Sequence, residues 1–314
     1  MNPTRLEMLS LLASLGTVRA VAARLHLSPS AVSAQLSVLE SEAGHPLLRR
    51  VGRRVELTAA GQALVPHARS ILDQLRLARQ EVGRVAGERV TTVRVAAFTS
   101  AARSLLLPLA GRLAAAAEPI RVEIAELDTG PAVQALRQGE CDLAVISDAA
   151  EYRVPGADLR VRSLLVDPLL VVGPVGDPDL ADGGRVRLEA LARRRFATDL
   201  PGSYLATALD RACAQAGFDP IVVGRMSSYE LLLAHVEAGL SITVLPSMAV
   251  DRRYRVVACR PAEPLHRTVS MVARAAVIAG GAGRTVAEAL LTSARAAQDA
   301  TWDGKPAANG GSGL

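Results

Sequence analysis

Residues 17–43 read TVRAVAARLHLSPSAVSAQLSVLESEA, and this stretch decides the fold of the N-terminal part. A short helix is expected over residues 20–25, with Thr17 placed to cap it. Ser28 then stands where the N-cap of a second helix belongs, and Pro29 falls at the first helical position, where its missing N–H costs nothing. The pattern predicts two helices joined by a two-residue turn.

The second helix, expected to end near Ala43, has two distinct faces. Val32, Leu36, Leu39 and Ala43 recur at spacings of 4, 3 and 4 and form one apolar face. The other face carries Ser30, Ser33, Ala34 and Ser37. Such small groups let a helix enter a major groove, where hydroxyls can bond to base edges. The two helices therefore indicate a helix-turn-helix that binds DNA.

An arginine-rich segment follows this pair of helices. Four arginines flank Gly52, a short strand is expected over residues 55–57, and Thr58 can cap the next helix. Residues 1–58 thus predict a winged helix-turn-helix domain. Its expected DNA contacts are Thr17, Arg19, Ser28, Pro29, Ser30, Ser33, Ala34, Gln35, Ser37, Arg49, Arg50, Arg53 and Arg54. Taken singly, the small-residue helix could pack on a neighbour and the arginines could line a solvated turn, but their order and spacing favour DNA.

Positive charge is concentrated in the same part of the chain. The first 90 residues hold 12 arginines and 7 acidic residues, whereas the remainder holds 24 basic and 24 acidic residues. The formal net charge of +5 therefore lies beside the helix-turn-helix pattern. Because cations there displace counterions from phosphates, we expect double-stranded DNA as a partner and an affinity that falls steeply with salt.

The composition of the whole chain excludes other classes of protein. Half of the 314 residues are hydrophobic, so a sizeable core is expected. No apolar run of about 18 residues lacks a charge and the N-terminus is too polar for an export signal, so we expect a cytoplasmic, nucleoid-associated protein without membrane contact. Cys141, Cys213 and Cys259 lie far apart, which predicts buried thiols and no metal site.

Residues 59–88 are expected to form one long linker helix. Its apolar positions recur at spacings of 4 and 3, which is typical of a coiled-coil seam. They are Leu64, Ala68, Ile71, Leu75, Ala78, Val82 and Val85. A second copy of the chain suits such a seam, so we expect a dimer through this helix; the alternative is packing within its own domain. Residues 87–89 are expected to form a hinge.

From about residue 92 onward, strands alternate with helices, which predicts an α/β fold with parallel sheets. The expected strands are 93–97, 121–127, 143–147, 169–173, 195–199, 242–245 and 268–273. The expected helices are 100–117, 131–138, 188–193, 204–216, 229–238 and 283–297. The Gly- and Ala-rich tail, residues 298–314, is expected to be disordered.

Motifs along nearly the whole chain resemble those of the LysR-type transcriptional regulators. In the N-terminal part they are Ala22-Ala23-Arg24-Leu25-His26-Leu27-Ser28, Ala31-Val32-Ser33-Ala34-Gln35-Leu36, Leu39-Glu40, Gly44-His45-Pro46-Leu47-Leu48-Arg49-Arg50 and Leu57-Thr58-Ala59-Ala60-Gly61. In the C-terminal part they are Gly139-Glu140-Cys141-Asp142-Leu143-Ala144-Val145 and Gly239-Leu240-Ser241-Ile242-Thr243-Val244-Leu245-Pro246. The N-terminal set is the more specific of the two.

The resemblance implies a multi-domain α/β protein. An N-terminal all-α winged helix-turn-helix and a long linker helix would precede a two-lobed effector domain of the periplasmic-binding-protein type over 92–297. Lobe I would comprise 92–162 and 268–297, and lobe II 163–267. The resemblance further implies promoter DNA as target, assembly as a homotetramer, RNA polymerase as a further partner, and no catalytic activity. An unidentified small-molecule co-inducer between the lobes would be the only ligand, without a cofactor or metal.

Candidate effector contacts follow strands and open helices, where exposed N–H groups favour a carboxylate. They are Thr99, Ser100, Asp128, Thr129, Ser147, Thr198, Ser203, Tyr204 and Thr243. Ordinary helix capping is an equally good explanation for any single one of them. The acids Asp128, Asp148 and Asp199 suit a zwitterion such as an amino acid better than a pure anion.

The proposed reading face departs from the family pattern. Ala34 stands where the family often has a long polar residue, so few long hydrogen-bonding side chains remain. We therefore expect specificity to depend on DNA shape and on arginines of the wing in a minor groove. An Arg53→Ala protein with unchanged affinity and sequence preference would contradict this expectation.

Three functions remain in competition on the sequence alone. The leading one is a transcription factor whose DNA-binding heads change spacing when an effector shifts the population of lobe arrangements. An enzyme or transport-type receptor is a rival, but no catalytic constellation or nucleotide motif stands out. The second rival is an architectural DNA-binding protein whose ligand pocket has decayed.

Overall fold

The computed structural model describes residues 1–52, 54–86, 90–117, 119–147, 159–180 and 184–299. Arg53, the hinge expected at 87–89, Asp148 and residues 300–314 lie outside this part of the chain. Two compact units are present: unit 1 comprises Met1–Leu164 and Ser270–Ser293, and unit 2 comprises Leu165–Val269 and Ala294–Leu314. The domain boundaries expected from the sequence stay a prediction.

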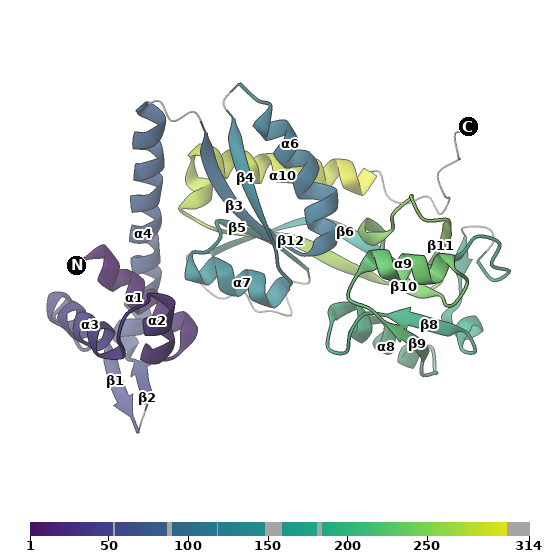
Figure 1. Ribbon diagram of the computed structural model, residues 1–314, viewed down its shortest axis with the longest axis horizontal. Helices are drawn as coiled ribbons and strands as arrows, with labels where there is room; N and C mark the ends of the chain where they lie inside the picture. The colour runs from purple at the N-terminus through teal and green to yellow at the C-terminus, as the bar shows by residue number, and fades with distance from the viewer. Residues whose placement is uncertain (53, 87–89, 118, 148–158, 181–183, 300–314) are drawn as a thin grey trace. The chain divides into compact units, whose positions relative to one another are not determined.

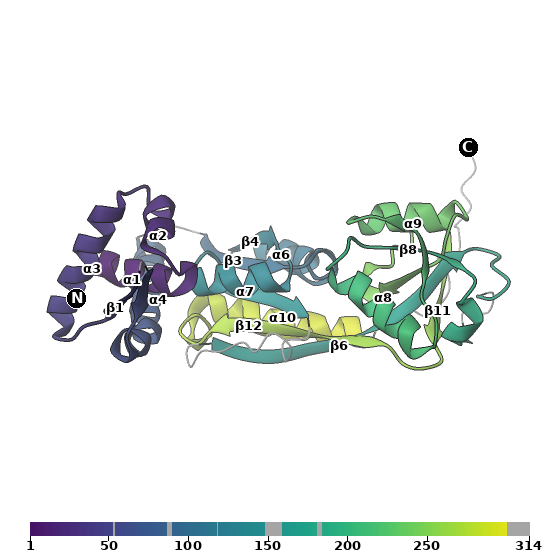
Figure 2. The same ribbon diagram turned by 90° about the horizontal axis from the view of Figure 1, so that it is seen from below.

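The head of unit 1 consists of helices α1 (Pro3–Leu15), α2 (Val18–Arg24) and α3 (Pro29–Ala43) and a hairpin (Figure 1, Figure 2). The expected caps are confirmed: Ala20 N–H donates to Thr17 Oγ1 and Ala31 N–H to Ser28 Oγ, both over 3.1 Å. Helix α3 ends at Gly44, whose φ of 71° lies in the left-handed region that favours glycine. The head core is formed by Leu6, Met8, Leu9, Leu11, Leu12, Val21, Ala22, Val32, Leu36, Leu39, Leu47, Val65 and Ala68.

The sequence predicted an arginine-rich segment followed by one strand, whereas the wing consists of two paired strands. Strands β1 (Leu48–Val51) and β2 (Arg54–Leu57) form an antiparallel hairpin in which Arg49 lies opposite Glu56. Strand β1 could not be predicted from the sequence because its adjacent arginines point to both faces of the strand, so apolar and polar residues do not alternate along it. The head is therefore helical apart from this hairpin.

Helix α4 (Ala59–Val85) confirms the expected long helix, but its apolar seam has two different environments. Ala68 is buried in the head core, and Leu64 packs on it. Ile71, Leu75, Val82 and Val85 are exposed, with Val82 and Val85 at 68% and 75%. The alternative given for this helix, packing within its own domain, therefore holds for its first half, where α1 packs against it.

Lobe I of unit 1 is built on three parallel strands in the order β4 (Ile120–Glu126), β3 (Thr91–Ala97) and β5 (Leu143–Ser147). Helix α7 (Thr129–Gln138) packs on β5 and β3, and α6 (Leu107–Ala114) packs on β4. Figure 1 shows α7 on the opposite side of these strands from α6 and α10 (Gly281–Asp299). Arg112 donates to Ser293 Oγ over 2.6 Å and joins α6 to α10.

The expected helix 100–117 is not uniform. It starts as α5 (Thr99–Ala101), widens into the π-helix η1 (Ala102–Leu106) and continues as α6. Pro108 lacks the N–H that a regular α-helix would use at this point, which accounts for the widened turn before it.

Unit 2 departs from the expectation of parallel sheets. The long strand β6 (Leu159–Pro174) enters it from unit 1, and β10 (Thr243–Pro246) and β11 (Val256–Pro261) both pair with β6 in antiparallel fashion. Parallel pairs are β11 with β7 (Arg185–Val186) and β8 (Arg195–Thr198) with β9 (Ile221–Arg225). The strand β12 (His266–Arg274) and helix α10 also pass from one unit into the other.

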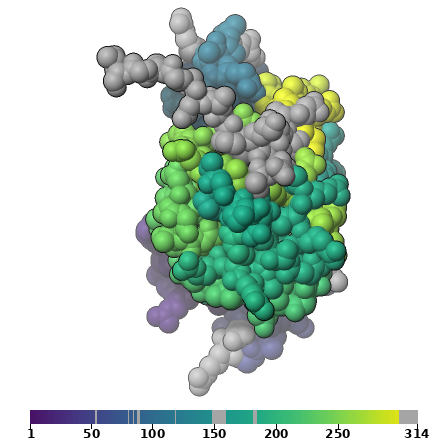
Figure 3. All heavy atoms as spheres, turned by 90° about the vertical axis from the view of Figure 1, so that its right-hand side faces the viewer, coloured from purple at the N-terminus to yellow at the C-terminus, as the bar shows by residue number. Residues whose placement is uncertain are grey.

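The remaining elements of unit 2 are helical. They are η2 (Leu188–Leu191), α8 (Tyr204–Gln215), α9 (Tyr229–Glu237) and η3 (Ser247–Ala249). The expected helix 188–193 is thus one short 3-10 turn. The expectation of a disordered tail from residue 298 is wrong for Gln298 and Asp299, which belong to α10. Two apolar clusters fill unit 2, one around Phe196 and one around Leu245. Figure 3 views the molecule from the side on which the teal and green surface of this unit faces the reader.

Candidate functional site

The N-terminal half of α3 presents the small residues expected to face DNA. Ser30, Ser33, Ala34 and Ser37 are all exposed, while Val32, Leu36 and Leu39 are buried on the opposite face. Ser28 Oγ lies 2.9 Å from Ser30 Oγ, so the two hydroxyls are held together at the start of the helix. The expected division of α3 into a core face and a free face is confirmed.

The other expected DNA contacts of the head differ in their surroundings. Thr17, Arg19, Pro29 and Arg50 are exposed. Gln35 accepts a 2.8 Å hydrogen bond from Arg5 Nε, and Arg49 is paired with Glu56 at 3.0 Å across the hairpin. These bonds use the Gln35 carbonyl oxygen and one nitrogen of Arg49, so other donors of both side chains can still contact DNA. Arg54 lies on β2.

Two residues position the wing, and the sequence did not assign them this role. Glu40 Oε1 accepts hydrogen bonds from the N–H groups of Leu47 and Leu48, each at 2.9 Å. Thr58 donates from its hydroxyl to Pro46 O at 2.8 Å and caps α4 at Gly61 N–H. A Cβ at Gly61 would lie 2.2 Å from Leu47 O, so only glycine permits this close approach.

The cap and contact roles of Ser28 can be separated by one substitution. We expect Ser28→Asp to keep the stability of the head, because aspartate caps as well as serine, whereas Ser28→Ala loses about 1 kcal/mol. Ser28→Asp should nevertheless weaken DNA binding, since it places a negative charge where phosphates approach. Denaturant unfolding and operator-binding titrations check the two effects. Equal DNA affinity of Ser28→Asp and wild type would contradict a DNA-facing position.

The carboxyl ends of β3, β4 and β5 bring five of the expected effector contacts to one edge of lobe I. Thr99 and Ser100 follow β3, Asp128 and Thr129 follow β4, and Ser147 ends β5. Thr129 Oγ1 lies 3.2 Å from Ser147 Oγ and accepts the Ser147 N–H at 3.1 Å. Thr99 donates to Glu126, an acid that the sequence did not single out.

Helix capping explains some of these residues and not others. Asp128 stands at the N-cap of α7 but makes no side-chain cap bond, and its side chain is exposed. Thr99 follows the N-cap residue Phe98 and is itself inside the helix. In lobe II, by contrast, Ser203 Oγ accepts Ala206 N–H at 3.2 Å and is a genuine cap of α8.

The remaining lobe II candidates are mostly buried. Thr198 and Thr243 are 3% and 1% exposed, and Tyr204 packs beside an apolar cluster. Thr243 lies directly after Ile242, which bridges Phe196 of β8. Within the described residues, Thr243 Oγ1 is a buried oxygen without a hydrogen-bond partner. The nine effector contacts as a set stay a prediction.

A cluster of charges, in which Asp73, Asp142 and Arg274 are buried, joins α4 to the strands of lobe I. Asp142 accepts hydrogen bonds from Arg76, from Arg94 at 3.0 Å and from Arg274 at 3.1 Å. Arg274 also lies 3.0 Å from Asp73 of α4. Burial raises the pKa of Asp142, but the hydrogen bonds and charges of Arg94 and Arg76 outweigh it, so this pKa lies below its ordinary value.

The three cysteines are buried, as the sequence predicted. Burial raises the pKa of Cys141 and of Cys213 to about 12, so both are protonated thiols at neutral pH. In the described part of the chain, no group of three or more His, Cys, Asp or Glu residues could hold a metal ion. No single described helix is long and apolar enough to cross a membrane, although α1 and α2, bent by 120°, meet that test as a pair.

These features define an effector-controlled DNA-binding regulator, and comparison with known proteins identifies its family. Residues 3–62 match the model of the bacterial regulatory helix-turn-helix protein of the lysR family, and residues 86–295 match the LysR substrate binding domain. The chain belongs to the LysR family of transcriptional regulators. It is a DNA-binding transcription regulator with an effector-binding domain and is not an enzyme.

Individual relatives and structures agree with this assignment. The HTH-type transcriptional regulator ShiR of Corynebacterium glutamicum is 32% identical over 227 residues, which cover 71% of this chain and 75% of ShiR. A full-length OxyR variant from Pseudomonas aeruginosa has 24% sequence identity and a TM-score of 0.62, with 99% of both chains covered. LysG from Corynebacterium glutamicum with the bound effector Arg has 21% identity and a TM-score of 0.60 over 94% of this chain and 99% of LysG.

Proposed function

We propose that this regulator reads DNA with the exposed face of α3 and with its wing, and that a second copy of the chain covers the exposed half of α4. The DNA-reading proposal rests on helix α3, which exposes small side chains on one face while the opposite face is buried in the head core. The dimer proposal rests on Ile71, Leu75, Val82 and Val85, which repeat at helical spacing and are all exposed. Tetramer formation, contact with RNA polymerase and association with the nucleoid are parts of the same proposal.

We propose further that the carboxyl edge of the lobe I sheet contacts a zwitterionic effector. Glu126 and Asp128 are exposed acids at this edge, where they suit a cationic amino group. The side chain of the N-cap residue Asp128 makes no cap bond to the first N–H groups of α7, and such groups suit a carboxylate. A solved relative by fold, LysG, carries an amino acid effector.

Strand β5 supplies a route from this edge to the linker helix. It ends at Ser147 in the effector edge and begins directly after Asp142, which binds Arg76 of α4. A shift of β5 by a bound effector would therefore act on the ion pairs that hold α4. The proposed response is a change in population between two arrangements of α4, each favoured to a different degree by the effector.

A thermal-shift screen of the purified protein against amino acids and their N-acetylated forms tests the effector proposal. A true effector at about 100 times its Kd adds about 2.7 kcal/mol to the folded state, whereas its N-acetyl form should not. Thr99→Val should raise the effector Kd about three- to tenfold, because one exposed hydrogen bond is lost.

The matched control for this screen is Thr292→Val, which removes another exposed helical hydroxyl, one that donates to Glu288 O. DNA affinity without effector should be the same in wild type and both variants. Equal effector affinity of the two variants would contradict the proposal that the effector binds at the lobe I edge. If no amino acid or small organic acid shifts the melting temperature, a regulator whose effector pocket no longer binds a ligand is favoured instead.

A further inference from the structure

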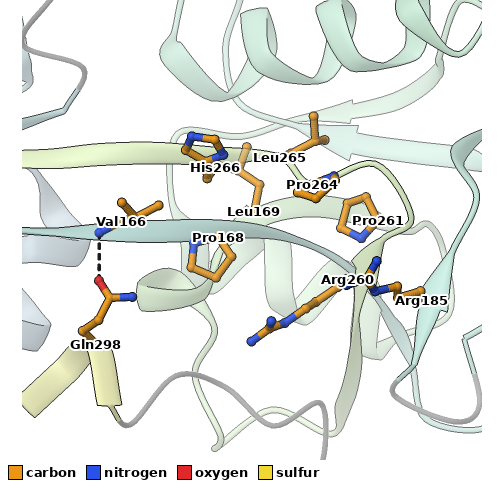
Figure 4. Close-up of a pocket in the computed structure, with 10 residues that line it drawn as sticks. All are labelled: Val166, Pro168, Leu169, Arg185, Arg260, Pro261, Pro264, Leu265, His266 and Gln298. Carbon is orange, nitrogen blue, oxygen red and sulfur yellow. Dashed lines mark hydrogen bonds between the residues drawn. The ribbon is translucent and has the colours of Figure 1, made fainter.

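Unit 2 contains a cavity that shares no residue with the effector edge. Its volume is about 360 Å3, and it is bordered by β6, β11, the start of β7 and of β12, and the end of α10 (Figure 4). A cavity of this size is at the lower end of the range for small-molecule sites.

Most of the wall is apolar and rigid. Pro168, Pro261 and Pro264 contribute three fixed rings, and Leu169 and Leu265 lie among them. Leu169 N–H donates to Leu265 O over 2.9 Å, so these two strands are tied together at the cavity. Because proline fixes its own backbone, the wall keeps its shape without a ligand.

The frame behind this wall is equally well fixed. Asp167, between Val166 and Pro168, accepts two hydrogen bonds from Arg267 at 2.8 and 3.0 Å, and both side chains are buried. At the other border, Gln298 Oε1 accepts the N–H of Val166 over 2.9 Å (Figure 4). The cavity is therefore preformed by bonds that do not involve its open space.

The polar part of the cavity is cationic. Arg260 of β11 and Arg185 of β7 are direct partners in the register of two parallel strands, so their side chains leave the sheet on the same face. Like charges directly opposite each other in neighbouring strands are destabilising. Within the described part of the chain, neither guanidinium forms an ion pair and no residue that lines the cavity is acidic. Figure 4 shows the Arg260 side chain extending toward Pro168 and Gln298.

We propose that this cavity binds a small organic acid, with its carboxylate between Arg185 and Arg260 and its apolar body against the proline wall. The carboxylate removes the repulsion between the two guanidiniums and accepts charge-assisted hydrogen bonds from both of them. An inorganic anion would leave the apolar wall unused, and a neutral apolar molecule would leave the repulsion in place. The site is thus a second ligand site of the regulator, independent of the effector edge.

Phenylacetate is the probe for this site. Phenylacetamide, which lacks the charge, and acetate, which lacks the apolar body, are the matched control compounds. Saturation-transfer NMR titration of the full-length protein should give a Kd of about 1–10 mM for phenylacetate. Phenylacetamide and acetate should each bind at least about tenfold more weakly. Arg260→Gln and Arg185→Gln should each weaken phenylacetate binding about tenfold or more.

Arg187→Gln is the control variant, because Arg187 lies two residues beyond Arg185, is 79% exposed and pairs with Glu189 outside the cavity. It should bind phenylacetate as the wild type does, and so should Thr99→Val at the effector edge. No saturable binding of phenylacetate, equal binding of phenylacetamide, or unchanged binding by both Arg260→Gln and Arg185→Gln would each overturn the proposal. Loss of binding in Thr99→Val alone would place the probe at the effector edge and also overturn it.

Discussion

Replacing Ala34 with glutamate is expected to weaken binding to operator DNA about a hundredfold or more. Ala34 lies on the exposed face of α3 between Ser33 and Gln35, opposite the buried Leu36. A glutamate there brings a larger side chain and a negative charge toward base edges and phosphates. The helix itself should be unaffected, because glutamate is a good helix former on an exposed surface.

Electrophoretic or fluorescence titration with a natural operator measures this effect. Ala116→Glu is the matched control, since Ala116 is also exposed but lies in lobe I after α6. The control makes the same change of charge and should keep wild-type DNA affinity within about twofold. If Ala34→Glu bound the operator as tightly as the control does, α3 would not be the reading helix.

Replacing Asp142 with asparagine is expected to lower the free energy of unfolding of lobe I by about 3–5 kcal/mol. The carboxylate is 4% exposed and binds three guanidiniums, those of Arg76, Arg94 and Arg274. Asparagine keeps the shape and removes the charge, so these cations lose their main partner inside the lobe. Denaturant unfolding followed by far-UV circular dichroism measures the change.

The neighbouring residue Glu140 supplies the control for Asp142. Glu140 pairs with Arg24 at 2.8 Å, but both side chains are about half exposed, so Glu140→Gln should cost no more than about 1 kcal/mol. A loss from Asp142→Asn that is no larger than the loss from Glu140→Gln would contradict a structural role for the cluster.

The lowered pKa of Asp142 also fixes the sign of a pH effect. A carboxylate whose pKa is lower in the folded state stabilises the fold above its unfolded pKa of about 3.9, and this contribution is lost as the pH falls through the folded pKa. The stability difference between wild type and Asp142→Asn should therefore shrink as the pH is lowered below about 4. Unfolding curves at several pH values check this, and a difference that grows toward acid pH would contradict it.

Local signals made the head of the molecule predictable. The cap at Ser28, the proline at the first position of α3 and the apolar spacing all lie within one short stretch, so each supports the same helix. The five residues at the lobe I edge could be grouped in advance because parallel strands end at the same side of a sheet. Their hydrogen bonds, such as that between Thr129 and Ser147, could not.

Features that depend on distant residues were missed or wrong. The first half of β6 carries the exposed Val161 and Val166, and β9 carries the exposed Ile221 and Val223, so neither has the buried alternation of an ordinary strand. The antiparallel pairing of β10 and β11 with β6 depends on contacts across long stretches of chain. Likewise, nothing near Asp142 in the sequence indicates that Asp73 and Arg274 join its cluster.

The cysteines of this chain can be compared with a relative that is named for its response to hydrogen peroxide. The hydrogen peroxide-inducible genes activator of Dickeya chrysanthemi is a relative, yet burial keeps Cys141 and Cys213 protonated here. Reactive sensor thiols are accessible and have lowered pKa values. Cys141 and Cys213 therefore lack the properties of such thiols.

Sequence-specific DNA binding is tested by selecting fragments of the protein's own genome with the purified full-length protein and then titrating the best fragment with salt. We expect at least about a hundredfold preference over a scrambled duplex, an affinity that falls steeply with salt, and loss of the preference in Ala34→Glu. Equal and weak binding to every fragment and to the scrambled duplex would contradict a sequence-specific regulator.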